Sequence, residues 1–191
     1  MKKLRVVLIF TFALCFNCDE IEELLEEDIE VNIAFQGKLA VQSPILPDPQ
    51  DAVQIDSEEA VYDIYDDPEI SELIATFGPG TGNVEKIEIT QIRYLFQDFE
   101  GNTDAIVVGN IGVVANSTSF QNFPTVQTNL AKADENNSLF TIDGDFTTIN
   151  ESITRTGRVF VVFTGSASDN PVSFNVDVTI LVKVTISPPD L

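Results

Sequence analysis

Histidine and tryptophan are absent from this 191-residue chain, and cysteine occurs only twice, as Cys15 and Cys18. Without histidine, the chain cannot build a Ser-His-Asp triad or a histidine-ligated zinc or iron site. The glycine-rich segment 78–82 follows a predicted helix instead of joining a strand to a helix, so it indicates a turn and not a phosphate-binding loop. Any catalysis would have to rest on carboxylates, serine, lysine or tyrosine. The sequence therefore predicts a protein that is not an enzyme and has no cofactor.

Basic residues are also scarce. The chain has 10 Lys and Arg against 31 Asp and Glu, which gives a formal net charge of −21. Three of the cations (Lys2, Lys3 and Arg5) lie in an N-terminal leader, and its removal would leave seven cations and a net charge of −24. Such a surface repels phosphate backbones and anionic headgroups, so nucleic acid is excluded as an expected partner.

The N-terminal leader predicts where the protein is transported. Residues 1–17, MKKLRVVLIFTFALCFN, join a basic start to an apolar run that is too short to span a bilayer and is typical of a secretory signal peptide. Cys18 follows directly, and the acidic run DEIEELLEED fills positions 19–28. This arrangement resembles the bacterial lipoprotein signal of the Bacteroidota type, in which the cysteine after the cleavage site is acylated. The resemblance implies a signal peptide at 1–17 and a lipidated acidic tether at 18–29.

Lipidation of Cys18 would have two consequences. A multiply acylated cysteine attaches a protein stably to a membrane, because each buried methylene contributes about 0.8 kcal/mol. The resemblance places the chain at the outer membrane, facing either the cell surface or the periplasm. With Cys15 removed and Cys18 acylated, the folded domain would contain no thiol, and therefore no disulfide and no thiolate metal site.

Hydrophobic alternation is the main structural signal. In 172–186, VSFNVDVTILVKVTI, every second residue from Val172 to Ile186 is apolar, which predicts a strand with one buried face. Because 15 residues exceed the usual strand length, this strand is expected to bend or to cross between sheets. The nearly continuous apolar run at 158–164 predicts a central strand that is buried on both faces and forms a hairpin with 172–186.

Other segments complete the predicted fold. Strands are expected at 30–41 with a bulge at Gly37, and at 84–99 with a bulge near Gln91 that forms a hairpin with 105–115. Residues 67–78 predict a helix that Asp67 caps, residues 146–153 predict a second short helix, and 132–138 predicts a loop. Together these patterns predict a single domain at 30–191: an antiparallel β-sandwich, immunoglobulin-like in the broad sense, with one or two short helices.

Acidic side chains are the only candidates for a chemical site. Asp143, Asp145 and Asp134 are weak candidates for calcium, which binds carboxylate and carbonyl oxygens, although none lies in an EF-hand spacing and Asp145 serves equally well as a helix cap. Paired carboxylates such as Asp143 and Asp145 could also hydrolyse glycosides, but 31 acids make such pairs inevitable. No other metal is expected.

The sequence predicts a class of function and no particular ligand. The expected protein is a non-catalytic, lipid-anchored binding or structural module of the cell envelope, with the membrane and a protein or glycan as its partners. A glycan-binding accessory of a polysaccharide uptake system is one alternative, and a carboxylate-based glycoside hydrolase is another. The absence of tryptophan and the presence of only three tyrosines make a sugar-stacking platform less expected.

Overall fold

A computed structural model describes residues 28–77, 84–116 and 119–187 of the chain. Cys18 and the predicted tether up to residue 27 lie outside these residues, whereas Ile29, predicted as the last tether residue, is the first residue of β1. The described elements, in chain order, are β1 (Ile29–Gln42), β2 (Val53–Asp56), β3 (Ala60–Asp63), the 3-10 helix η1 (Ile64–Asp66), α3 (Pro68–Phe77), β4 (Val84–Gly101), β5 (Ile106–Asn116), β6 (Ser119–Pro124), β7 (Thr128–Asn129), α4 (Leu130–Glu135), β8 (Phe140–Ile142), α5 (Thr147–Thr156), β9 (Arg158–Ala167) and β10 (Val172–Ile186).

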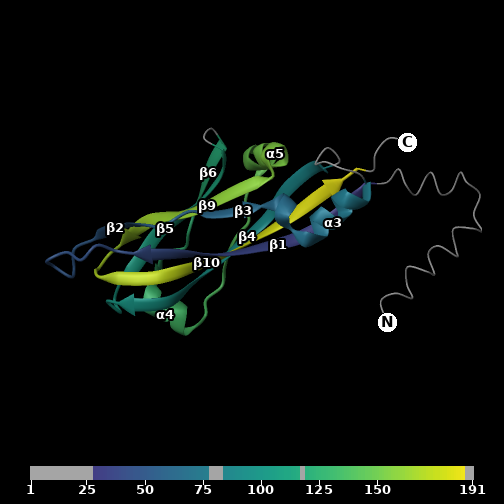
Figure 1. The fold of residues 1–191 in the computed structure, drawn as a ribbon. Coiled ribbons are helices and arrows are strands. Elements are labelled where there is room, and N and C mark those ends of the chain that lie inside the picture. The colour runs from purple at the N-terminus through teal and green to yellow at the C-terminus, as the bar shows by residue number, and fades with distance from the viewer. Residues whose placement is uncertain (1–27, 78–83, 117–118, 188–191) are drawn as a thin grey trace, which may run out of the picture.

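The strands form two antiparallel sheets that pack face to face (Figure 1). Sheet A has the order β1-β10-β4-β8, and sheet B has the order β2-β9-β5-β6, with β3 added to β9 and β7 added to β5. The predicted β-sandwich is confirmed. Six of the nine connections between consecutive described strands pass from one sheet to the other, and β1-β10-β4-β8 faces β2-β9-β5-β6. This strand order is that of a jelly roll, a different connection from the immunoglobulin order within the same architecture.

Both predicted hairpins are wrong for the same reason. β4 lies in sheet A beside β10, whereas β5 lies in sheet B beside β9, so the turn at 101–105 carries the chain from one sheet to the other. The connection from β9 to β10 does likewise. Alternation fixes which face of a strand is buried, but it contains no information about which strand is the neighbour.

The long C-terminal strand β10 occupies the centre of sheet A. Val176, Val178 and Ile180 alternate with half-buried polar residues, as the sequence predicted. The strand does not cross between sheets, because it pairs with β1 over 14 consecutive residues without a register shift. Its pairing with β4 is interrupted between Leu181 and Val182, opposite Gln91, which confirms the predicted bulge there.

The predicted bulge at Gly37 is wrong in the pairing of β1 with β10. Gly37 has the same parity as the inward-facing residues Ile33 and Leu39, and the ring of Tyr62 from β3 lies over it. An ideal Cβ on Gly37 would lie 1.6 Å from the Tyr62 hydroxyl oxygen. The glycine therefore makes room for a side chain that contacts β1 from the other sheet, and Phe35 packs beside it with a ring-centre distance of 5.7 Å.

The helices begin and end where local chemistry places them. Asp67 accepts hydrogen bonds from the backbone N–H groups of Glu69 (2.9 Å) and Ile70 (3.3 Å), which confirms it as the cap of α3. The predicted second helix is confirmed as α5, which ends at Gly157 in the left-handed conformation. The short helix α4, by contrast, replaces the loop predicted at 132–138 for most of its length.

The two sides of sheet A differ in how their edges are covered. The edge of β4 that faces away from β10 is covered by α5, β8 and α4 in turn along the strand. At α4, Asp134 accepts a hydrogen bond of 2.9 Å from the Phe99 N–H. On the opposite side, β1 pairs with β10. Among the described residues, the only other backbone pairing of β1 is the bridge between Val41 and Ser57. Sheet A therefore has one covered edge and one open edge.

Candidate functional site

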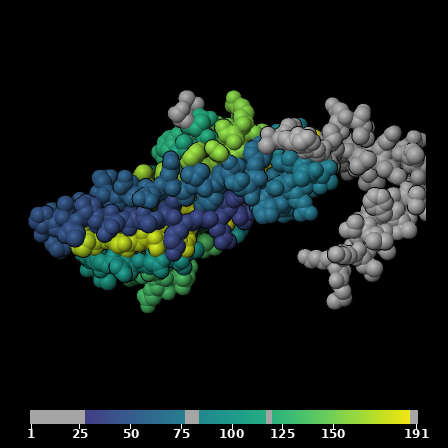
Figure 2. All heavy atoms as spheres, in the orientation of Figure 1, coloured from purple at the N-terminus to yellow at the C-terminus, as the bar shows by residue number. Residues whose placement is uncertain are grey.

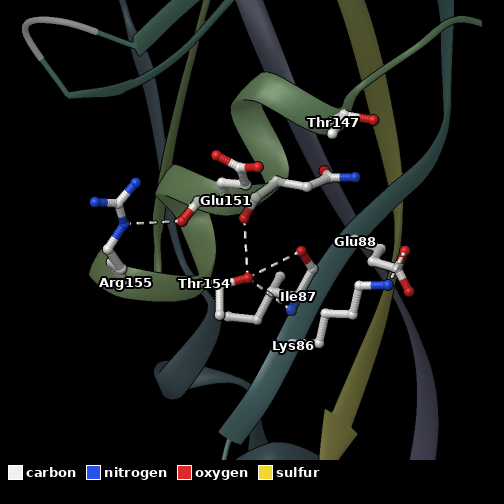
Figure 3. A pocket seen from close by; sticks show the side chains of 8 residues that line it. Lys86, Ile87, Glu88, Thr147, Glu151, Thr154 and Arg155 are labelled. Atoms are coloured by element: carbon white, nitrogen blue, oxygen red, sulfur yellow. Dashed lines mark hydrogen bonds and ion pairs between the residues drawn. The ribbon is translucent and has the colours of Figure 1, made fainter.

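A groove of about 530 Å³ lies between α5 and the outer edge of β4. Figure 3 shows its lining residues (Lys86, Ile87, Glu88, Thr147, Asn150, Glu151, Thr154 and Arg155). The groove exists because no described strand pairs with the outer edge of β4 along this stretch. The helix α5 therefore contacts that edge through its side chains.

The contacts across this groove replace a strand ladder. The Ile89 N–H donates to Oδ1 of Asn150 at 2.8 Å, and the Ile87 N–H donates to Oγ1 of Thr154 at 2.9 Å. Residues four apart on a helix are separated by about 6 Å along its axis, and alternate strand residues by about 6.7 Å, so the two periods match. This match lets one helix face satisfy two successive amide groups of β4.

On the strand side of the groove, Lys86 and Glu88 form an ion pair. Lys86 Nζ lies 2.8 Å from Glu88 Oε1, and Lys183 Nζ lies 3.5 Å from the other Glu88 oxygen. The hydrogen bond from Lys86 lowers the pKa of the Glu88 carboxyl, with smaller contributions from Lys183. On the helix side, Arg155 Nε donates to the Glu151 carbonyl at 3.2 Å. Asn150 and Thr154 therefore hold α5 against β4, whereas the charged side chains contact groups within β4, within α5 or on β10.

Replacing Asn150 by alanine is expected to lower the free energy of unfolding by about 1–2 kcal/mol, because the half-buried Ile89 N–H would lose its acceptor. Asn150→Asp is the matched control, since it keeps an oxygen at the same position. Urea denaturation of the two variants checks the expectation. An equal loss of stability in both would contradict the role given to the amide oxygen.

The three calcium candidates lie in separate hydrogen-bonded positions. Asp143 accepts from Gln91 Nε2 at 2.8 Å, and Asp134 accepts from the Phe99 N–H. Asp145 accepts from the N–H (2.9 Å) and the hydroxyl (2.6 Å) of Thr147 at the start of α5, and these bonds lower the pKa of its carboxyl. Among the residues described, no three acidic or thiol side chains gather in a group that could hold a metal ion.

A second hollow of about 500 Å³ lies between β1, β10 and the loop that follows β2, and acidic residues line it. Its lining includes Asp56, Glu58 and Asp98. Asp98 accepts from Lys38 Nζ at 3.0 Å and from Asn175 Nδ2 at 2.7 Å, and these hydrogen bonds lower the pKa of its carboxyl. A glycosidase general acid needs a raised pKa, so Asp98 is set for the opposite protonation state.

The outer face of sheet B is the most unusual surface of the domain. Its outward side chains on β3, β9, β5 and β6 include two apolar groups separated by Asn110 and Thr164, and we call this outer surface the sheet B face. Val61, Phe120 and Val108 are 56%, 53% and 46% exposed, respectively. Cross-strand pairing aligns one of these groups, since Val61 lies opposite Phe160, Phe160 opposite Val114, and Val114 opposite Phe120. The remaining members are Ile106 and Val162.

Charge is confined to the borders of this face. The ion pair between Arg158 Nε and Asp63 Oδ2 (2.8 Å) lies at one end of β9, and Asp56 on β2 lies opposite Thr164 at the side of the face. Between them, the outward residues of β9, β5 and β6 are aliphatic, aromatic, small or amide side chains. On a chain with a net charge of −21, a face of this size without a central charge is a feature that solvation alone does not explain.

Sequence reasoning passed over this face. The run at 158–164 was predicted to be buried on both sides, and the inner residues Val159, Val161 and Phe163 are indeed buried. The outer residues Phe160 and Val162 are only half-buried, because no further layer of described residues covers sheet B there. The central position of β9, between β2 or β3 on one side and β5 on the other, is confirmed. The sheet B face would have been predicted if the apolar run at 158–164 had been assigned to a central strand that is covered on one face only.

Comparisons with known proteins give likenesses of fold only. No protein-family model and no curated protein matches the chain. Among solved structures, it is similar to the decameric BFDV capsid protein, with 10% identity, a TM-score of 0.40, and coverage of 83% of this chain and 99% of that one. It is also similar to a structure of turnip yellow mosaic virus, with 11% identity, a TM-score of 0.36, and coverage of 86% and 98%. None of the described helices is long and apolar enough to cross a membrane.

Proposed function

We propose that this protein is a non-catalytic, lipid-anchored module of the cell envelope that binds another protein through the sheet B face. The observation that carries the proposal is the exposed apolar group around Phe120, which has no charged residue at its centre. Cys18 would supply the anchor to the outer membrane. A tether at 18–29 would hold the domain near the membrane and leave it free to meet a partner.

The chemistry of the sheet B face selects the kind of partner. The row of Val61, Phe160, Val114 and Phe120 crosses four strands spaced by about 4.8 Å, so it extends about 14 Å across the sheet. An exposed aromatic ring among aliphatic neighbours is typical of the centre of a protein interface. Because the borders of the face and the rest of the chain are acidic, the fitting partner has an apolar patch with lysine or arginine around it.

A glycan is the rival ligand, and one observation favours it. Asn110, Asn122 and Thr164 lie on the same outer face as Phe120, so amide and hydroxyl groups adjoin an exposed ring. This combination suits a sugar, whose hydroxyl groups need hydrogen bonds while its ring carbons contact an aromatic face. The protein partner remains the proposal, because the exposed area of the face is mainly aliphatic.

The anchor has a direct test. Cys18→Ala is expected to move the protein from the membrane fraction to the soluble fraction, because the thiol that would carry the acyl chains is gone. Mass spectrometry of the membrane-bound wild type should show an acylated N-terminal cysteine, and Cys15→Ala is the matched control that should remain in the membrane. Membrane association of the Cys18→Ala variant would refute the anchor.

The binding face is tested separately, by a photo-crosslinking amino acid placed at Phe120 in cells, with Arg93 on the outer face of sheet A as the control position. Crosslinking at 120 and not at 93 is expected. The captured protein, once purified, should bind the wild type at least tenfold more tightly than it binds Phe120→Asp. Equal binding of both would refute the proposal, and binding of sugars on a glycan array that Phe120→Asp abolishes would replace it by the rival.

A further inference from the structure

The open edge of β1 is long and regular. All 14 residues of β1 pair with β10 in an unbroken register, without a bulge or a proline. Natural edge strands are usually short, bulged or covered, because their unpaired backbone groups otherwise recruit another strand. Figure 2 shows the purple atoms of β1 uncovered on the side of the sandwich that β1 and β3 form. The covered edge of β4 on the opposite side makes this exposure a specific property of β1.

The hydrogen bonds at the end of β1 establish which backbone groups point outward. The Ser43 N–H donates to the Val172 carbonyl at 2.9 Å, one position beyond the last β1–β10 pair. Because the register is unbroken, every odd-numbered residue of β1 directs its N–H and C=O toward β10. The even-numbered residues, from Glu30 to Lys38, therefore direct theirs toward the open side.

The same even-numbered residues make β1 complementary to itself. If two copies of β1 lie antiparallel about Ala34, Glu30 of one copy lies opposite Lys38 of the other, and Asn32 lies opposite Gln36. Lys38 and Glu30 have side chains that are 54% and 58% exposed, so both can contact a second partner while keeping their internal ion pairs. The two-fold axis falls on alanine, which is small enough for its two copies to meet.

We propose that this protein pairs with a second copy of itself through β1, antiparallel and centred on Ala34, which joins the two copies of sheet A into one continuous sheet. About ten backbone hydrogen bonds would form between the copies, two for each of the outward-pointing pairs. The two Glu–Lys contacts offset part of the repulsion between two acidic chains, and they fix the register, because a shift of two residues separates them. This interface is independent of the sheet B face, so either can fail alone.

A second copy fits better than an unrelated strand, because the charges come in a self-complementary order. An isologous contact requires that residue i meets residue j and that j meets i, and Glu30 and Lys38 satisfy this about one axis. A strand from another protein would gain the backbone hydrogen bonds but would need its own charges in that order.

Cysteine crosslinking tests the proposal in the full chain. In the predicted register, the two copies of position 34 are a hydrogen-bonded pair with Cα atoms about 5.5 Å apart, which a disulfide spans. Ala34→Cys is therefore expected to give a dimer band on oxidation of intact cells that produce the full chain. Ala40→Cys, on the same exposed face of the same strand, should give less than a tenth of that band, because its two copies lie about 40 Å apart. The wild type controls for disulfides through Cys15 or Cys18.

Charge reversal then tests the register. In the Ala34→Cys background, Lys38→Glu is expected to reduce the dimer band at least fivefold, and adding Glu30→Lys should restore it, because the pairs are re-formed with exchanged signs. Thermal melts confirm that each variant is folded. No dimer at position 34, equal dimer at 34 and 40, a crosslinked band whose mass shows a different protein, or no restoration by the double exchange would each overturn the proposal.

Discussion

Replacing Phe96 by alanine is expected to lower the free energy of unfolding by about 3–5 kcal/mol, a large part of the total stability of a domain of this size. The ring is completely buried and touches both sheets. It lies 5.6 Å from the ring centre of Phe174 on β10 and 6.1 Å from that of Phe163 on β9, in edge-to-face arrangements. Its removal would leave a cavity between the layers that the surrounding strands cannot close.

The control is the same substitution on the sheet B face. Phe120→Ala removes an equal side chain that is 53% exposed, and its effect on stability should stay below about 1 kcal/mol. Urea denaturation monitored by circular dichroism measures both variants. Similar losses for Phe96→Ala and Phe120→Ala would contradict the assignment of Phe96 to the centre of the core, or would mean that a further layer covers Phe120.

The sequence determined the faces of the strands much better than it determined their neighbours. The alternation of β10, the phase change near Gln91 and the cap at Asp67 each rest on interactions within a few residues, and each is confirmed. The pairing of β4 with β10 joins residues about 80 positions apart, such as Phe96 and Val176. A turn of a few residues is compatible with a hairpin or with a crossing between sheets, and this ambiguity produced both hairpin errors.

The surfaces that could bind a partner were beyond sequence reasoning for a related physical reason. An exposed apolar face has the same residue types as a buried one, so Phe160 and Val162 could be recognised as outward-facing only once sheet B was seen to lack an outer layer. The opposite error concerns Gly37, because a glycine within a strand pattern predicts an irregular backbone. Its actual role is to accommodate Tyr62, which approaches from β3, 25 positions away in the chain.

Replacing Gly101 by alanine is the second change with a large expected effect, a loss of about 3 kcal/mol or more. Gly101 ends β4 with φ of +119°, a conformation that side chains on L-residues rarely adopt, and this strain alone costs about 1–3 kcal/mol. An ideal Cβ would also lie 2.1 Å from the carbonyl oxygen of Pro171. That oxygen accepts a hydrogen bond of 3.0 Å from the Asn102 N–H, so it cannot move away without breaking the connection between β4 and β10.

Gly144→Ala provides the matched control, because Gly144 is an exposed glycine outside the left-handed region and its ideal Cβ would come no closer than 3.3 Å to the ring of Phe123. Its stability should change by less than about 1 kcal/mol. A thermal melt of each variant gives the comparison. If Gly101→Ala melts at the temperature of the wild type, the backbone at the end of β4 has a different conformation from the one that the structure shows at Gly101. The close approach to Pro171 would then be contradicted. If both variants are destabilised equally, the loss belongs to alanine in loops of this chain in general and not to the close approach of the Pro171 carbonyl.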